Sequence, residues 1–95
     1  MSNVLELVAA LQALEAYGSI PEPTTDYGEY GEYEVTHPLV DKCEDLACAC
    51  LITNGQYDFA AIQDLETHGY RICYAERFGW LIGGITTSVG TIYYG

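Results

Sequence analysis

Residues 70–94 read YRICYAERFGWLIGGITTSVGTIYY, and this stretch decides the fold. From Tyr70 to Glu76, aromatic and aliphatic side chains occupy every second position, which is the period of a strand with one buried face. Gly83-Gly84 in the next strand marks a bulge or a close backbone approach. The sequence predicts a three-stranded antiparallel meander with strands at residues 70–76, 80–87 and 91–94 and turns at 77–79 and 88–90.

Helical periodicity precedes this sheet. Apolar residues from Val4 to Leu14 recur every three or four positions, and Gly18 ends the pattern. Asn3 and Glu6 have the spacing of an N-terminal capping box. A second helix is expected from Thr36–Pro38 to Asn54-Gly55, and a third from its N-cap at Asp58 to His68, with Gly69 ending it. The predicted fold class is α+β: two or three helices followed by a small antiparallel sheet.

Residues 19–35, SIPEPTTDYGEYGEYEV, differ from both patterns. Glycine discourages helix here, while tyrosine and valine favour extended chain. We expect an acidic loop, rich in Tyr and Gly, that runs into a short strand near residues 30–35. That strand is a candidate fourth strand of the sheet. Connections of this length in small domains are often functional or disordered.

The net charge limits the classes of partner that are expected. The chain has 95 residues, the size of a single domain over 1–95, with 14 acidic and 3 basic residues and a net charge of -11. Direct contact with nucleic acid or an anionic membrane needs Lys and Arg, so neither is expected. A basic protein surface, such as that of a nucleic-acid-binding protein, is the expected partner. An acidic surface that serves solubility alone is the alternative.

The acidic loop is the main candidate site. Its carboxylates lie two or three residues apart, which on extended backbone means about 7–10 Å, and its tyrosines are of the type enriched in binding hot spots. A mobile solvated loop and tyrosine phosphorylation or sulfation are the alternatives. A second acidic group is expected on the exposed face of the second helix. The predicted partner-binding residues are Asp26, Tyr27, Glu29, Tyr30, Glu32, Tyr33, Glu34, Asp41, Glu44 and Asp45.

The cysteines do not form a metal motif. Cys43 and Cys50 belong to the expected buried face of the second helix, and neither they nor Cys48 and Cys73 make a paired C-x2-C pattern. Residues 1–17 have no basic n-region, carry Glu6 and Glu15 and have the pattern of an amphipathic helix rather than of a signal peptide, so reduced thiols and a cytoplasmic location are expected. No catalytic group, metal or other cofactor is predicted, and His68 is expected to face a helix C-terminus.

Residues 59–85 resemble part of a winged-helix domain. A helix ends in Leu65-Glu66-Thr67-His68-Gly69, and a hairpin follows through Phe78-Gly79-Trp80-Leu81, as do the recognition helix and wing of that family. DNA-binding members offer Lys or Arg from the helix, whereas this helix offers Asp64 and Glu66. The resemblance implies a regulatory or assembly module that binds protein through an apolar and aromatic surface.

The whole chain is similar in composition to inhibitors carried by phages and mobile elements. Small size, strong acidity and Tyr-rich acidic runs are typical of DNA-mimic antirestriction proteins and several anti-CRISPR proteins. No motif carries this likeness, so it assigns no residue a role. It implies a stoichiometric inhibitor, rather than an enzyme, that occupies a nucleic-acid groove of a host defence or DNA-binding protein.

Overall fold

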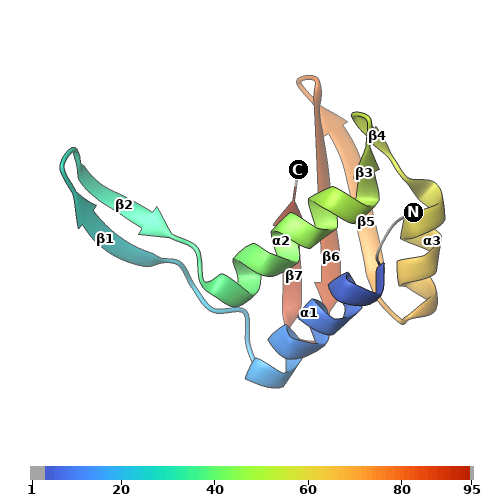
Figure 1. Cartoon of the computed structure of the whole chain (residues 1–95), viewed down its shortest axis with the longest axis horizontal. Coiled ribbons are helices and arrows are strands. Elements are labelled where there is room, and N and C mark those ends of the chain that lie inside the picture. Colours follow the sequence, from blue (N-terminus) through green and yellow to red (C-terminus); the bar gives the residue numbers. More distant parts are fainter. Residues whose placement is uncertain (1–3, 95) are drawn as a thin grey trace.

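The computed structural model describes residues 4–94 and has the predicted α+β class (Figure 1). Helices α1 and α2 lie against one face of a three-stranded sheet, α3 packs beside strand β5, and a hairpin projects from the body. The elements are α1 (Val4–Tyr17), β1 (Thr24–Gly28), β2 (Gly31–Val35), α2 (Pro38–Leu51), β3 (Ile52–Thr53), β4 (Gln56–Tyr57), α3 (Phe59–Thr67), β5 (Arg71–Arg77), β6 (Trp80–Thr87) and β7 (Gly90–Tyr94).

The C-terminal sheet confirms the predicted meander. Its strand order is β5-β6-β7, and both pairs are antiparallel. Ile72, Ile85 and Ile92 are cross-strand neighbours on the face toward the helices. The pairing runs through Gly83 without a bulge, because this glycine serves a close approach instead: a Cβ there would collide with the ring of Tyr94.

The core forms between this sheet face and the three helices. Leu7, Leu11 and Leu14 of α1 are fully buried, as the spacing of apolar residues predicted. Asp58 is the N-cap of α3, with its side chain accepting a hydrogen bond from the Ala61 amide at 3.1 Å. The largest fully buried side chains are Leu7, Leu11, Leu14, Leu51, Ile62, Leu65, Ile85, Val4 and Cys43. The proposed cap residue Asn3 lies outside the described residues.

Helix α2 begins as predicted but ends earlier than predicted. Pro38 is in its first turn, as expected, and the ring of His37 accepts a hydrogen bond from the Leu39 amide at 3.2 Å. The helix ends at Leu51, before the predicted Asn54-Gly55 stop. Those two residues instead have φ values of 52° and 74° and form the turn between β3 and β4, because Asn-Gly favours the tight turn of a two-residue hairpin.

The prediction for residues 19–35 was wrong in two respects. The segment is a β-hairpin rather than a loop with one strand, and β2 pairs with β1 rather than with the C-terminal sheet. The repeated Tyr-Gly-Glu places Gly28 and Gly31 at the two ends of the Glu29-Tyr30 turn, with Gly31 at a φ of 113°. A residue with a Cβ rarely adopts that backbone conformation, so the second glycine allows the chain to reverse.

Candidate protein-binding surface

The hairpin of β1 and β2, called the arm below, extends away from the helices and the sheet (Figure 1). Both five-residue strands are exposed along their whole length. Tyr30 at the tip is 99% exposed and Tyr27 is 74% exposed. Aromatic side chains of this size bury a large area when a partner covers them, so their exposure makes the arm a candidate contact surface.

The register of the arm divides its side chains between two faces. Asp26 lies opposite Tyr33, and the Tyr33 hydroxyl donates a hydrogen bond to the Asp26 carboxylate at 3.3 Å. The Tyr33 ring also covers Gly28, where a Cβ would lie 3.0 Å from it. Tyr27 lies opposite Glu32, and Glu34 is on that same second face, opposite Thr25.

The expected single line of carboxylates is therefore not what the structure has. Because the chain reverses at Glu29-Tyr30, Asp26 lies on the other strand and the other face from Glu32 and Glu34. Glu32 and Glu34 remain neighbours on one face, about 7 Å apart at the rise of a strand. The arm is a two-sided anionic ribbon, and residues 19–36 contain no Lys or Arg to neutralise it.

Packing at the base holds the arm in place. The side chain of Ile20 contacts the turn between β6 and β7, where a Cβ on Gly90 would lie 2.9 Å from it. Tyr17 at the end of α1 and His37 at the start of α2 bring their rings within 5.5 Å of each other, centroid to centroid. The chain therefore leaves and re-enters the body at a packed junction, which fixes where the arm emerges.

The second predicted acidic group lies on α2, the element that follows the arm. Asp41 and Asp45 are exposed and one helical turn apart on the same face. Glu44 is half-buried, and burial raises its pKa, with a further rise from the charges of Asp41 and Asp45. Glu44 and Asp45 also line a hollow of about 410 Å³ with Cys48 and Tyr94. The acidic face of α2 therefore follows directly after the acidic arm in the sequence.

The cysteines and histidines have structural positions. The four cysteines are not joined by disulfide bonds. Burial raises the pKa of the Cys43 thiol, and the charge of Glu44 raises it further. His68 is the C-cap of α3, with its ring nitrogen 2.9 Å from the Asp64 carbonyl. Within residues 4–94, no three or more His, Cys, Asp or Glu side chains are grouped as a metal site.

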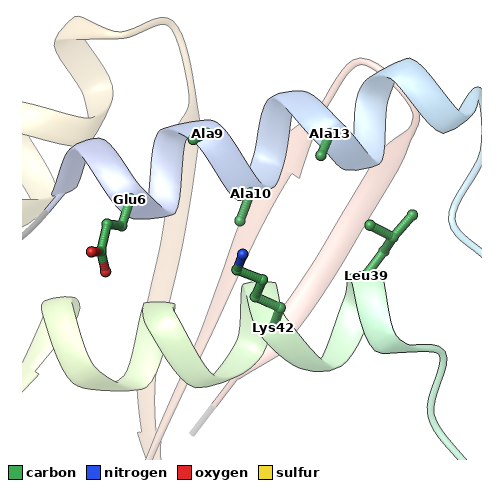
Figure 2. A pocket seen from close by; sticks show the side chains of 6 residues that line it. All are labelled: Glu6, Ala9, Ala10, Ala13, Leu39 and Lys42. Carbon is green, nitrogen blue, oxygen red and sulfur yellow. The ribbon is translucent and has the colours of Figure 1, made fainter.

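Sequence reasoning missed a hollow of about 350 Å³ between α1 and α2. Figure 2 shows the Lys42 side chain reaching from α2 toward α1 below Ala10, with Glu6 farther along the same groove. Small side chains of α1 leave the space open. The lining residues are Glu6, Ala9, Ala10, Ala13, Leu39 and Lys42. The signal in the sequence is the run of alanines on α1, which is equally typical of a plain solvent-facing helix.

Sequence reasoning also missed the sheet face that the helices leave uncovered, called the open face below. Its positions follow from the register: they alternate with the buried isoleucines along each strand. Trp80 is 72% and Tyr93 is 67% exposed there. The open face consists of Arg71, Cys73, Ala75, Arg77, Trp80, Ile82, Gly84, Thr86, Thr91 and Tyr93.

A comparison of this chain with protein-family models, curated proteins and solved structures finds no match. The winged-helix and inhibitor resemblances therefore remain predictions. In the part of the chain that the structure describes, no helix has both the length and the apolar character needed to cross a membrane.

Proposed function

We propose that this chain is a binding protein that puts its acidic arm into a basic groove of a nucleic-acid-binding protein and so blocks that groove. The observation that carries the proposal is the arm itself, a hairpin that projects from the body with all of its strand residues exposed. Both faces of the arm are available for contact with a groove.

Charge supports this choice of partner. Asp26, Glu29, Glu32 and Glu34 give the arm four carboxylates over a short length, and the chain as a whole has a net charge of -11. Such a surface attracts a cationic groove over a long range and is repelled by nucleic acid. The attraction is screened by salt, so association is expected to slow and weaken as ionic strength rises.

The tyrosines supply the short-range part of the interaction. Tyr27 and Tyr30 are largely free of contacts that would cover them, and a tyrosine loses little conformational entropy when it is immobilised. Packed against the aliphatic stems of Lys and Arg, their rings would add apolar contact between the ion pairs. Asp41 and Asp45 on α2 extend the anionic surface beyond the arm.

Binding without catalysis is the function that the titratable groups support. The ring of His37 accepts a hydrogen bond from the Leu39 amide, and that of His68 bonds to the Asp64 carbonyl. The raised pKa of Cys43 disfavours its nucleophilic thiolate form. Each of these groups therefore has a structural role. A reducing cytoplasm remains the proposed setting.

The test is a capture experiment from host lysate with the tagged full chain. Proteins retained at low salt are challenged with high salt and, separately, with duplex DNA. We expect nucleic-acid-binding proteins to be retained and to be released by both treatments. The variant Glu29→Gln/Glu32→Gln/Glu34→Gln should lose them. Its matched control is Asp64→Asn/Glu66→Gln/Glu76→Gln, which removes three exposed carboxylates away from the arm and should retain them.

A second candidate is an apolar protein-binding module, as the winged-helix resemblance implies. Phe78, at the tip of the β5–β6 hairpin, is 99% exposed and occupies the place of a wing. Capture that resists high salt, survives the triple Gln substitution and is lost in Phe78→Ser would favour this module and contradict the arm.

A further inference from the structure

The middle of the open face lacks the charged side chains that water-facing strands normally have. In an antiparallel sheet with one solvated face, outward positions are usually polar. Here Ala75, Ile82 and Tyr93 occupy the middle of that face. Gly84 lies between Cys73 and Tyr93 in the register, and its missing side chain leaves a shallow hollow of about 300 Å³. An apolar, hollowed sheet face is a surface suited to a partner.

The charge on this face is opposite to that of the rest of the molecule. Arg71 and Arg77 are two of the three basic residues in the chain, and both are on the open face at opposite ends of β5. None of the open-face positions is acidic. At about 3.3 Å per residue the two arginines are roughly 20 Å apart along the strand. The face therefore fits an elongated, anionic partner with apolar or aromatic groups between its charges.

The arm has the matching chemistry and length. Each strand of the arm has five residues, which is about 16 Å at the rise of an extended strand, and Tyr27 and Tyr30 belong to the same ribbon. An isolated two-stranded hairpin is marginally stable in water. Contact with a second surface would therefore stabilise the arm as well as cover the open face.

We propose that the arm of one copy docks on the open face of a second copy, and that the exchange is reciprocal. An arm does not dock on the open face of the same copy, since the arm extends away from the sheet of its own chain (Figure 1). Direct packing of two open faces would bring the Arg71 and Arg77 pairs of both copies together, and like charges oppose that arrangement. A reciprocal exchange about a two-fold axis pairs each arm with one face and closes the assembly as a dimer.

This dimer uses the arm of the proposed function, so self-association and capture of a basic partner would compete. Experiments can nevertheless disprove the dimer and the capture of a basic partner independently of each other. Arg71→Gln/Arg77→Gln should weaken the dimer without removing any group from the arm. In the capture experiment, the same variant should retain its partners at least as well as the unaltered chain.

Sedimentation equilibrium of the full chain is the primary test. We expect a concentration-dependent rise from the monomer mass of 10.5 kDa toward twice that value, and a dimer that weakens with salt. Arg71→Gln/Arg77→Gln should raise the dimer dissociation constant by at least about tenfold, the loss expected of four exposed ion pairs, two at each arm–face contact. A chain that stays monomeric up to submillimolar concentration at low salt would overturn the proposal.

A charge-reversal pair separates arm exchange from other kinds of association. One variant, Arg71→Glu/Arg77→Glu, has an acidic face, and the other, Glu29→Arg/Glu32→Arg/Glu34→Arg, has a basic arm, because its three new arginines outweigh the one remaining carboxylate, Asp26. Each alone should be monomeric, because its arm and face then carry the same sign. The equimolar mixture should form a heterodimer, since both arm–face contacts are again complementary. Dimers of either single variant, open polymers, or no dimer in the mixture would each contradict reciprocal exchange. Circular dichroism checks that both variants are folded.

Discussion

The hydroxyl of Tyr70 donates a 2.6 Å hydrogen bond to the carboxylate of Glu15, across 55 residues of sequence. The other oxygen of Glu15 accepts hydrogen bonds from the amide of Ser88 at 3.1 Å and from its hydroxyl at 2.5 Å. One side chain near the end of α1 thus joins the start of β5 to the β6–β7 turn. Ile20 packs against Gly90 in that same region, so the contact also supports the base of the arm.

The first prediction concerns this carboxylate. Glu15→Gln should lower the free energy of unfolding by about 1 kcal/mol, because it replaces charged acceptors with a neutral amide at a partly exposed site. Urea denaturation at neutral pH measures the change. Glu66→Gln, an exposed substitution on α3, is the matched control and should leave the midpoint unchanged. Equal midpoints for all three proteins would show that the contact does not stabilise the fold.

The second prediction follows from the pKa of Glu15. Hydrogen bonds from Ser88 and then Tyr70 lower this pKa from its ordinary value of 4.5. Ionised Glu15 therefore stabilises the native state above pH 4.5, and that contribution is lost as the pH falls through the lowered native value. The stability difference between the unaltered chain and Glu15→Gln should be constant near neutral pH and shrink below pH 4.5. A difference that grows on acidification would have the wrong sign.

The third prediction concerns Glu44, whose pKa moves the other way. Burial and the charges of Asp41 and Asp45 raise this pKa above 4.5, so ionisation of Glu44 opposes folding. Glu44→Gln should increase the free energy of unfolding at neutral pH by a few tenths of a kcal/mol, and the gain should disappear in acid as Glu44 becomes protonated. Thermal melts at pH 7 and pH 4 measure this. Destabilisation by Glu44→Gln at neutral pH would contradict the prediction.

The fourth prediction concerns the packing of Tyr94 over Gly83. Gly83→Ala should destabilise the protein by about 1–3 kcal/mol, the usual cost of overpacking a core, because the new methyl group collides with the Tyr94 ring. Gly84→Ala is the matched control: its Cβ would lie 3.3 Å from Thr91 and Tyr93 on the open face, where those side chains can move. The midpoint of urea denaturation should fall much further for the first variant. Equal losses would mean that the Tyr94 ring yields.

The sequence predicted the elements of the body well, because their signals are local. The strand predicted from the alternation at Tyr70 to Glu76 and the N-cap at Asp58 each depend on a few adjacent residues, and both are present in the structure. Within β5, however, only Ile72 is buried. The β3–β4 hairpin was missed because two-residue strands are too short to have a period. The arm was missed because its strand partner lies within the same apparent loop, and polar strands lack the apolar alternation that identifies a sheet.

The sequence predicted which residues belong to the candidate site, but it did not predict how they are arranged in space. The exposed tyrosines and carboxylates of the arm were named from sequence, but their distribution over two faces depends on the register set by Gly28 and Gly31. The open face was not anticipated at all. Alternation along β5 predicts that one face is buried without saying whether a second layer covers the other.

By itself, the sequence determined the charge of this protein, the three helices and the C-terminal meander, since each depends on composition or on the spacing of neighbouring residues. Tertiary structure decided which surfaces remain uncovered: the arm that extends from the body and the apolar sheet face with its two arginines. Exposure depends on how distant elements pack. Glu15, Tyr70 and Ser88 meet only after the chain has folded, and no local pattern encodes that contact.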